Sequence, residues 1–168
     1  MSRSVLSLSG NPRPRSRTAS LALAVARAIA DLGPAGPVVE IDLSNRVATD
    51  EELRAIVVEA DVVVVASPTY KATFTGLLKT FLDGVPTGAL RGVIAIPVMV
   101  AGDRAHALAV DVHLRPLLLE LGASCPTPGL FVEEAALEDL PAAIAPWLEA
   151  AAPVLDAVLR APRAEAIA

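Results

Sequence analysis

The sequence predicts an α/β fold in which helices cover both faces of a five-stranded parallel sheet, giving a three-layer sandwich. Short apolar runs alternate with segments of helical periodicity along the 168 residues of the chain. This alternation is typical of an open, doubly wound sheet. The run Val62–Val65 adds a second observation, because four consecutive β-branched residues suit a strand that is buried on both faces.

The first half of the chain predicts two pairs of strand and helix. The expected strands are Val5–Ser9 and Val38–Leu43, and the expected helices are Thr18–Leu32 and Asp50 to about Ala60. Gly33 and Pro34 end the first helix because neither residue continues helical geometry well. Thr49 is placed to cap the second helix, and acidic residues follow it in the first turn.

The second half predicts three further pairs. The expected strands are Asp61–Ser67, Val93–Val100 and Ser124–Val132, and the expected helices are Gly76–Gly84, Ala105–Leu121 and Leu137–Leu159. Two prolines place the fifth strand at an edge of the sheet, since proline cannot donate to a central ladder. We expect the last helix to be broken or kinked near Pro146 and Pro153.

Pro116 lies inside the expected helix Ala105–Leu121. It removes the N–H that would bond to the carbonyl of Val112, and its ring presses on that turn. We therefore expect a bulge or kink near Val112 and His113, of which a π-bulge is one form.

The composition indicates one globular domain over residues 1–168, with a ragged Ala/Arg tail after about residue 162. Hydrophobic residues make up 54% of the chain and charged residues 20%, which excludes a disordered protein. Cys125 is the single cysteine, so no intrachain disulfide can form. A reducing cytoplasm fits this cysteine usage.

The net charge of −5 argues against nucleic-acid binding, which depends on neutralising phosphates. Strand-like apolar runs such as Val93–Ala101 are shorter than the roughly 20 residues that span a bilayer. The chain enters a strand pattern at once, so we expect no signal peptide, no membrane partner and a cytoplasmic location.

Ligands of doubly wound sheets bind beyond the carboxyl ends of the strands, where the strand order reverses. Three predicted loops leave such ends: Ser9–Arg17, Ser67–Thr75 and Ala101–Ala105. The three loops are therefore the candidate site.

The first loop reads S-G-N-P-R-P-R-S-R-T from Ser9 to Thr18 and holds three arginines. A helix start and several guanidinium groups together favour a compact dianion such as a terminal phosphate. The loop lacks both G-x-G-x-x-G and G-x-x-x-x-G-K-[ST], so it is neither a Rossmann fingerprint nor a Walker A loop. The alternative is a solvated basic turn in which Thr18 only caps the helix.

The second loop, Ser67–Gly76, contains Tyr70, the single tyrosine of the chain. An aromatic side chain and Lys71 at a sheet edge could form one wall of a site for a planar heterocycle. The alternative is that Tyr70 only packs the loop onto the core, which is the role expected for Phe74. The third loop could offer backbone N–H groups to a ring carbonyl.

Three motifs together resemble a known family. They read S-G-N-P-R-x-x-S-R-T, S-P-T-Y-K-A-x-x-x-G-x-L-K-x-x-x-D and G-D-R-A-H-x-L-A-V-D-x-x-L-R-P. The pattern is similar to the NAD(P)H-dependent FMN reductases of the flavodoxin-like superfamily, and most similar to those that supply alkanesulfonate-type two-component monooxygenases. The resemblance extends from about Val5 to Leu121.

The resemblance implies an FMN site. The residues that it places around the phosphate are Ser9, Asn11, Arg13, Ser16, Arg17 and Thr18. Those along the ribityl chain and ring are Pro68, Thr69, Tyr70 and Lys71, and those at the isoalloxazine edge are Ala101, Gly102 and Asp103. No catalytic acid or base and no metal ligand is implied, because hydride transfer from the nicotinamide to flavin N5 requires mainly positioning.

The implied function is reduction of FMN by NADPH or NADH, with reduced FMN passing to a partner monooxygenase through a transient contact. One alternative is a reductase that retains FMN and reduces quinones, azo dyes or metal oxyanions. Another is a flavodoxin-type electron carrier, although carriers usually frame the ring with aromatics, and aromatics are only 3% here. A third alternative is a domain that keeps the fold but has lost flavin.

The resemblance also implies a homo-oligomer, a dimer or a homotetramer. In relatives, a π-bulge corresponding to Val112 lies at the tetramer interface, and the pair Lys79 and Asp83 lies near a subunit contact. For the pair the alternative is an ordinary surface ion pair. We expect His106 and His113 to be surface or interface residues and Cys125 to be a small buried residue.

Overall fold

The computed structural model describes residues 2–161. The expected tail after residue 162 lies outside the described residues. The principal elements are β1 (Val5–Ser9), α1 (Arg17–Ala30), β2 (Val39–Asp42), α2 (Asp50–Glu59), β3 (Val62–Pro68), α3 (Gly76–Asp83), β4 (Ile94–Ala101), α4 (Arg115–Glu120), β5 (Leu130–Glu133) and α5 (Leu140–Arg160). Short 3₁₀ segments cover Arg104–His106 and Glu134–Glu138.

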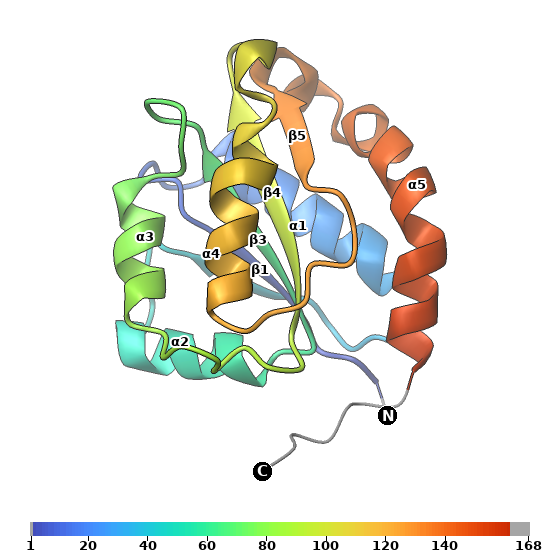
Figure 1. Ribbon diagram of the computed structural model, residues 1–168. Coiled ribbons are helices and arrows are strands. Elements are labelled where there is room, and N and C mark those ends of the chain that lie inside the picture. Colours follow the sequence, from blue (N-terminus) through green and yellow to red (C-terminus); the bar gives the residue numbers. More distant parts are fainter. Residues whose placement is uncertain (1, 162–168) are drawn as a thin grey trace.

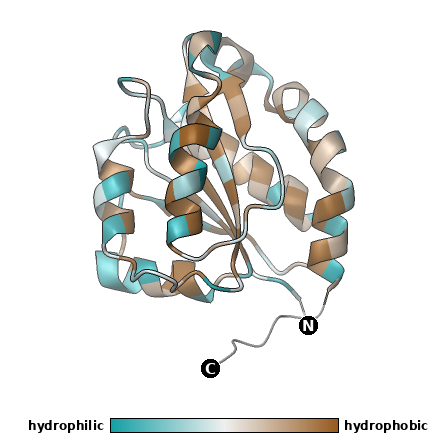
Figure 2. Cartoon of the chain, in the orientation of Figure 1, coloured by the Kyte–Doolittle hydropathy of each residue, from teal (hydrophilic) through white to brown (hydrophobic). Residues whose placement is uncertain are grey.

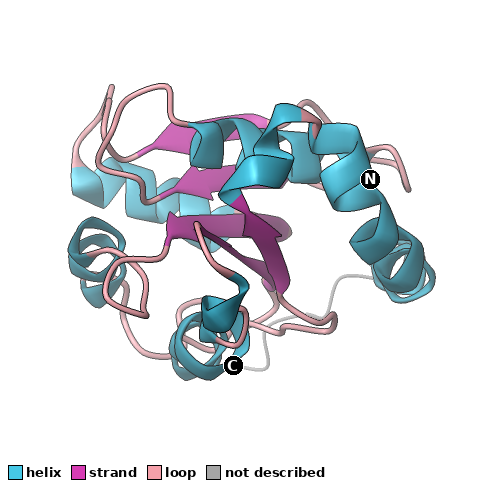
Figure 3. Cartoon of the chain, turned by 90° about the horizontal axis from the view of Figure 1, so that it is seen from above, coloured by secondary structure: helices cyan, strands magenta, loops and turns pink. Residues whose placement is uncertain are grey.

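The five strands form one parallel sheet in the order β2-β1-β3-β4-β5. Figure 1 shows α1 and α5 on one face of this sheet and α2, α3 and α4 on the other, and the view from above in Figure 3 shows the three layers. The predicted α/β sandwich is confirmed. The strand order reverses direction between β1 and β3, which places the topological switch point beside the first loop.

The core consists of two apolar clusters, one on each face of the sheet. Alternate residues of each strand contribute to opposite clusters: Val63 and Val65 face α2, α3 and α4, whereas Val62 and Val64 face α1 and α5. All four are at most 1% exposed, which confirms the prediction from the β-branched run. Figure 2 shows the corresponding apolar colouring of the central strands.

The last helix was expected to be broken or kinked near its two prolines, and it is not broken. Pro146 and Pro153 both lie inside α5, yet the helix is continuous from Leu140 to Arg160. Each proline frees the carbonyl four residues earlier, at Ala142 and Glu149, and all four of these residues are exposed. Water can satisfy carbonyls on the outer side of a helix, so the expected break does not occur.

The helix α5 is long and apolar enough to cross a membrane, judged by length and composition only. It packs on α1, however, and buries Ile144, Ala151, Leu155 and Leu159. The core helix of a globular protein meets the same criterion. Its end is tied to the sheet by Arg3, which donates to the carbonyl of Leu159 at 3.3 Å and pairs with Asp61 at 2.9 Å.

The bulge expected near Val112 is present as a π-helix at Val110–Leu114. The N–H of Arg115 donates to the carbonyl of Val110, five residues earlier. The predicted helix Ala105–Leu121 is therefore divided into a 3₁₀ turn, this π-helix and the short α4. The fifth strand is shorter than predicted, but it lies at the sheet edge as expected. At Ser124, where the strand was predicted to begin, the structure has only an isolated bridge to Ile94.

Candidate functional site

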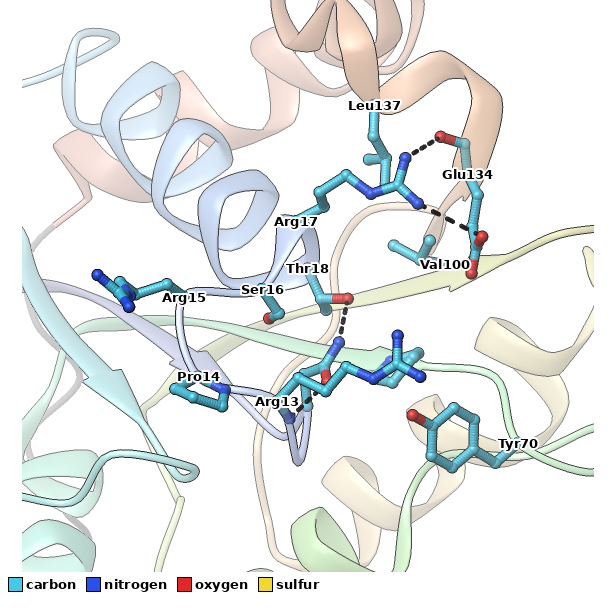
Figure 4. Close-up of a pocket in the computed structure, with 12 residues that line it drawn as sticks. Arg13, Pro14, Arg15, Ser16, Arg17, Thr18, Tyr70, Val100, Glu134 and Leu137 are labelled. Carbon is cyan, nitrogen blue, oxygen red and sulfur yellow. Dashed lines mark hydrogen bonds and ion pairs between the residues drawn. The ribbon is translucent and has the colours of Figure 1, made fainter.

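A pocket of about 290 Å³ opens at the carboxyl edge of the sheet, beside the switch point. Figure 4 shows its walls, which come from the loop after β1, the ends of β3 and β4 and the segment after β5. The lining residues are Asn11, Arg13, Pro14, Arg15, Ser16, Arg17, Thr18, Pro68, Tyr70, Val100, Glu134 and Leu137. The first two predicted loops therefore meet in one cavity.

Seven of the thirteen residues expected to contact FMN line this pocket: Asn11, Arg13, Ser16, Arg17, Thr18, Pro68 and Tyr70. Ser9, Thr69, Lys71, Ala101, Gly102 and Asp103 lie outside the lining. Five lining residues have no counterpart in the predicted set: Pro14, Arg15, Val100, Glu134 and Leu137. The structure thus brings the arginine-rich loop and the tyrosine loop together, while the third loop contributes only through its neighbour Val100.

Side chains of the first loop hold its backbone in a fixed shape. The amide of Asn11 donates to the hydroxyl of Thr18 at 3.0 Å, and the amide oxygen of Asn11 accepts from the N–H of Arg13 at 2.9 Å. Ser16 caps α1 by accepting from the N–H of Ala19 at 3.1 Å. Asn11, Ser16 and Thr18 are buried, so the loop is preorganised rather than a loose basic turn.

The three arginines of the first loop are exposed and extend in different directions. Figure 4 shows Arg13 extending along the pocket and Arg17 extending toward Glu134, whereas Arg15 points away from both. Arg15 has a positive φ of 51°, which is uncommon for a residue with a side chain. Arg15 also lines a neighbouring hollow, together with Arg46. The loop therefore directs two guanidinium groups, those of Arg13 and Arg17, along the main pocket.

The second loop folds into a tight hairpin. Tyr70 and Thr73 exchange backbone hydrogen bonds of 2.8 and 3.2 Å, and the two residues between them, Lys71 and Ala72, both have positive φ, at 51° and 66°. Two non-glycine residues in this conformation store strain. The hairpin presents Tyr70 at the pocket, where the residue is 46% exposed. Phe74 packs on the core, as expected.

A buried hydroxyl without a partner lies beside the pocket. The backbone N–H of Thr69 donates to the carbonyl of Val100 at 2.7 Å, which joins the second loop to the end of β4. Among the described residues, none forms a hydrogen bond with the Thr69 hydroxyl, although this oxygen is buried. A buried polar atom of this kind is costly unless a bound molecule or water satisfies it.

The third loop follows β4 at the same edge of the sheet. Asp103 caps the 3₁₀ turn by accepting from the N–H of Ala105 at 2.7 Å, so its carboxylate has a structural role. Gly102 is exposed, and no heavy atom lies within 4 Å of the position that a Cβ would take. Ala101 is buried and is level with Glu133 of β5. The space above Gly102 is therefore open to a ligand.

Sequence reasoning missed Glu134, which lines the pocket opposite the first loop. Its carboxylate lies 3.5 Å from the guanidinium of Arg17, and its backbone carbonyl accepts from the same group at 3.2 Å. Glu134 immediately follows β5, so it lies at the carboxyl end of a strand like the three predicted loops. That position was the signal that could have identified it.

Other predicted residues lie away from the pocket lining. Lys79 and Asp83 form an exposed ion pair on α3, and His106 and His113 are exposed. Cys125 is half-buried, so the prediction that it is buried is only partly correct. Burial raises the pKa of its thiol, and Arg115 offsets only part of this rise. A thiol of this kind is a poor nucleophile.

The fold and the pocket define a flavodoxin-type α/β domain with an arginine-rich loop at the switch point. The model of the NADPH-dependent FMN reductase family matches residues 3–137. The chain therefore belongs to this family.

Curated relatives match the chain over about half of its length. An FMN reductase (NADPH) of Pseudomonas putida is 40% identical over 84 residues, which are 50% of this chain and 43% of that protein. An FMN reductase (NADPH) of Escherichia coli K12 is 42% identical over 81 residues, 48% of this chain and 42% of the relative. A P. putida protein named NADH-dependent FMN reductase SfnF is 38% identical over 80 residues, 48% and 43% of the two chains. These alignments span less than half the length of each curated relative.

Solved structures match over nearly the whole chain. The apo form of the NADH:FMN oxidoreductase EmoB is 28% identical with a TM-score of 0.76, and the match covers 94% of this chain and 87% of that one. An oxidoreductase of Corynebacterium diphtheriae is 29% identical with a TM-score of 0.78, over 94% and 97% of the two chains. A flavodoxin-like WrbA-type protein of Agrobacterium tumefaciens, 16% identical over 90% of this chain and 98% of that one with a TM-score of 0.66, shares the fold.

Proposed function

We propose that this chain is an NAD(P)H-dependent FMN reductase, and that residues 1–168 act as a single FMN-binding domain. The observation that carries the proposal is one pocket in which a preorganised arginine loop meets an aromatic hairpin, in a member of the FMN reductase family. The relatives named FMN reductase (NADPH) and NADH-dependent FMN reductase support the donor class. Either NADPH or NADH fits this proposal.

The residues of the pocket fit the phosphate end of FMN. The first turn of α1 offers backbone N–H groups that have no intrahelical acceptor, and Ser16 and Thr18 lie beside them. Arg13 and Arg17 supply forked donors for phosphate oxygens. We assign Ser9 a supporting role, because its buried hydroxyl accepts from the N–H of Asn11 at 3.4 Å.

The residues of the second and third loops fit the remainder of FMN. Pro68 and Tyr70 line the pocket, the unsatisfied hydroxyl of Thr69 can donate to a polar group of the ligand, and Lys71 lies at the exposed turn of the hairpin. Ala101, Gly102 and Asp103 follow β4 at the same sheet edge and border the ring in this proposal.

The chemistry belongs to the two nucleotides, because FMN supplies a hydride acceptor at ring N5 and the nicotinamide supplies the hydride from its C4. The chain contributes position. The first loop fixes the phosphate, the hairpin fixes Tyr70 as one wall of the pocket, and the open space above Gly102 leaves room for the flavin ring. The proposal requires no side chain to gain or lose a proton.

We further propose that reduced FMN leaves for a partner monooxygenase in the cytoplasm, and that the chain forms a homo-oligomer. An exposed apolar stripe supports self-association: Leu108, Val112 and Leu119 of the π-helix region and α4 are 73%, 56% and 49% exposed. The free, half-buried thiol of Cys125 fits a reducing compartment. Light scattering of the purified protein tests the oligomer, since a monomer at micromolar concentration would contradict it.

Purified protein provides the test of the activity. We expect a colourless protein whose oxidation of NADPH or NADH, followed at 340 nm, depends on added free FMN. A yellow protein whose NAD(P)H oxidation does not depend on added FMN would contradict the release of flavin and indicate a reductase that retains it. Bound FMN without any NAD(P)H oxidation would indicate an electron carrier instead. Varying FMN and NAD(P)H together in steady-state kinetics identifies the donor and shows whether FMN behaves as a substrate.

A further inference from the structure

Glu134 is the acidic residue among the pocket-lining residues, which otherwise include three arginines. It lies at the start of the 3₁₀ segment after β5 and reaches across the pocket to the first residue of α1, Arg17. The guanidinium of Arg17 is bound twice, by the backbone carbonyl of Glu134 at 3.2 Å and by its carboxylate at 3.5 Å. Figure 4 shows both contacts.

The position of Arg17 explains why it binds an anion. A cation in the first turn of a helix lies at the positive end of the helix dipole, which is unfavourable unless an anion is near. The first turn of α1, all of it described, holds no acidic residue. Glu134 therefore supplies, from another element, the negative charge that a phosphate would also supply.

We propose that Glu134 sets the affinity for the FMN phosphate by competing with it for Arg17. The inference rests on the proposed function and deepens it. A phosphate that binds the first loop must share or displace the carboxylate at Arg17, and it also meets the negative charge of Glu134. Both effects weaken the binding of a flavin that carries a phosphate, and neither acts on riboflavin. A flavin held loosely by its phosphate can leave after reduction.

The pair is weak enough to be displaced. The side chains of Arg17 and Glu134 are 59% and 54% exposed, and exposed ion pairs contribute little to stability because water and salt screen them. Glu134 therefore tunes binding without blocking it. The backbone contact to Arg17 does not depend on the carboxylate, so a Glu134→Gln substitution removes the charge and leaves one anchor of Arg17 in place.

The chain offers a matched control in the neighbouring residue. Glu133 pairs with Arg104 at 3.6 Å and is absent from the pocket lining among the described residues. Glu133→Gln changes the net charge by the same amount, one residue away. A difference between the two variants therefore reports the pocket and not the overall charge.

The experiment titrates FMN and riboflavin into wild type, E134Q, E133Q, R17A and the R17A/E134Q double variant, followed by flavin fluorescence. We expect E134Q to lower the Kd for FMN about fivefold in low salt, with the gain shrinking as salt screens the charges. The Kd for riboflavin should change less than about twofold, and E133Q should match wild type. In the R17A background only the screened repulsion between Glu134 and the phosphate remains, so the effect of E134Q should fall below about twofold.

The inference is overturned if E134Q leaves the Kd for FMN unchanged, if E133Q has the same effect, or if E134Q acts fully without Arg17. The last result would indicate a general charge effect with no competition for Arg17. Failure of the proposed function gives a different result, because the wild-type protein would then bind neither FMN nor riboflavin. That outcome removes the inference as well.

Discussion

The hydroxyl of Thr75 donates a 2.6 Å hydrogen bond to the carbonyl of Gly10. It joins the loop after β1 to the loop after β3, which are the two loops that meet in the pocket. The same oxygen accepts from the N–H of Leu78 at 3.2 Å and so caps α3. Gly10 lies so close to this helix that an added Cβ would be 2.5 Å from the Cβ of Leu78. One buried side chain thus fixes the first loop against the start of α3.

We expect Thr75→Val to lower the free energy of unfolding by about 2–3 kcal/mol, because it removes a helix cap and leaves a buried carbonyl unpaired. The loop after β1 should also lose its fixed position, so FMN affinity should fall. Urea denaturation and flavin titration measure the two effects. Thr75→Ser keeps the hydroxyl and serves as the control. Unchanged stability in Thr75→Val would show that this bond does not hold the loops together.

Arg13→Ala tests the phosphate contact directly. A charge-assisted bond to a phosphate contributes about 1.5–3 kcal/mol, so FMN binding should weaken roughly 10- to 100-fold. Riboflavin lacks the phosphate, and its affinity should stay within about twofold of wild type. Arg27→Ala removes the same charge at the far end of α1 and is the control. Equal losses for FMN and riboflavin would mean that the loop does not bind the phosphate.

The sequence predicted the fold well because its signals are local. Four β-branched residues at Val62–Val65 and regular helical spacing in α1 need no tertiary information to be recognised. The π-helix at Val110–Leu114 was also accessible, since Pro116 removes one specific hydrogen bond. The prediction of a break in α5 was wrong because the effect of a proline inside a helix depends on whether the freed carbonyl is exposed to water. Pro146 and Pro153 face solvent, where water can bond the freed carbonyls, and exposure is a tertiary property.

The site was predicted only in part for a related reason. The first loop is contiguous in sequence, so Asn11 to Thr18 could be identified together. Glu134 lies 117 residues from Arg17, and only the parallel register of β4 and β5 brings the end of β5 to the same edge. The strained turn at Lys71 and Ala72 was equally hidden, because neither residue type favours positive φ.

Ala72→Gly should stabilise the protein, because glycine adopts positive φ without the steric cost that alanine bears. The relief is partly offset by the greater freedom of glycine in the unfolded chain, so the expected net gain is about 0.5–1 kcal/mol. Urea denaturation measures it. Ala150→Gly, at an exposed position inside α5, is the control and should cost about 1 kcal/mol. A loss of stability in Ala72→Gly would mean that the hairpin is not strained at this residue.

Gly102→Ala separates folding from ligand binding at the third loop. No heavy atom lies within 4 Å of the added methyl group, so the free energy of unfolding should change by less than about 0.5 kcal/mol. A flavin ring bordering Gly102 would meet this methyl, and overpacking costs about 1–3 kcal/mol, so FMN and riboflavin should both bind roughly 5- to 100-fold more weakly. The loss should be the same for the two flavins because it acts on the ring, in contrast to Arg13→Ala. Gly36→Ala, whose methyl would make an ordinary 3.8 Å contact with Ser2, is the control. Unaltered titrations of both flavins with Gly102→Ala would place the ring away from the third loop and remove Ala101, Gly102 and Asp103 from the proposed site.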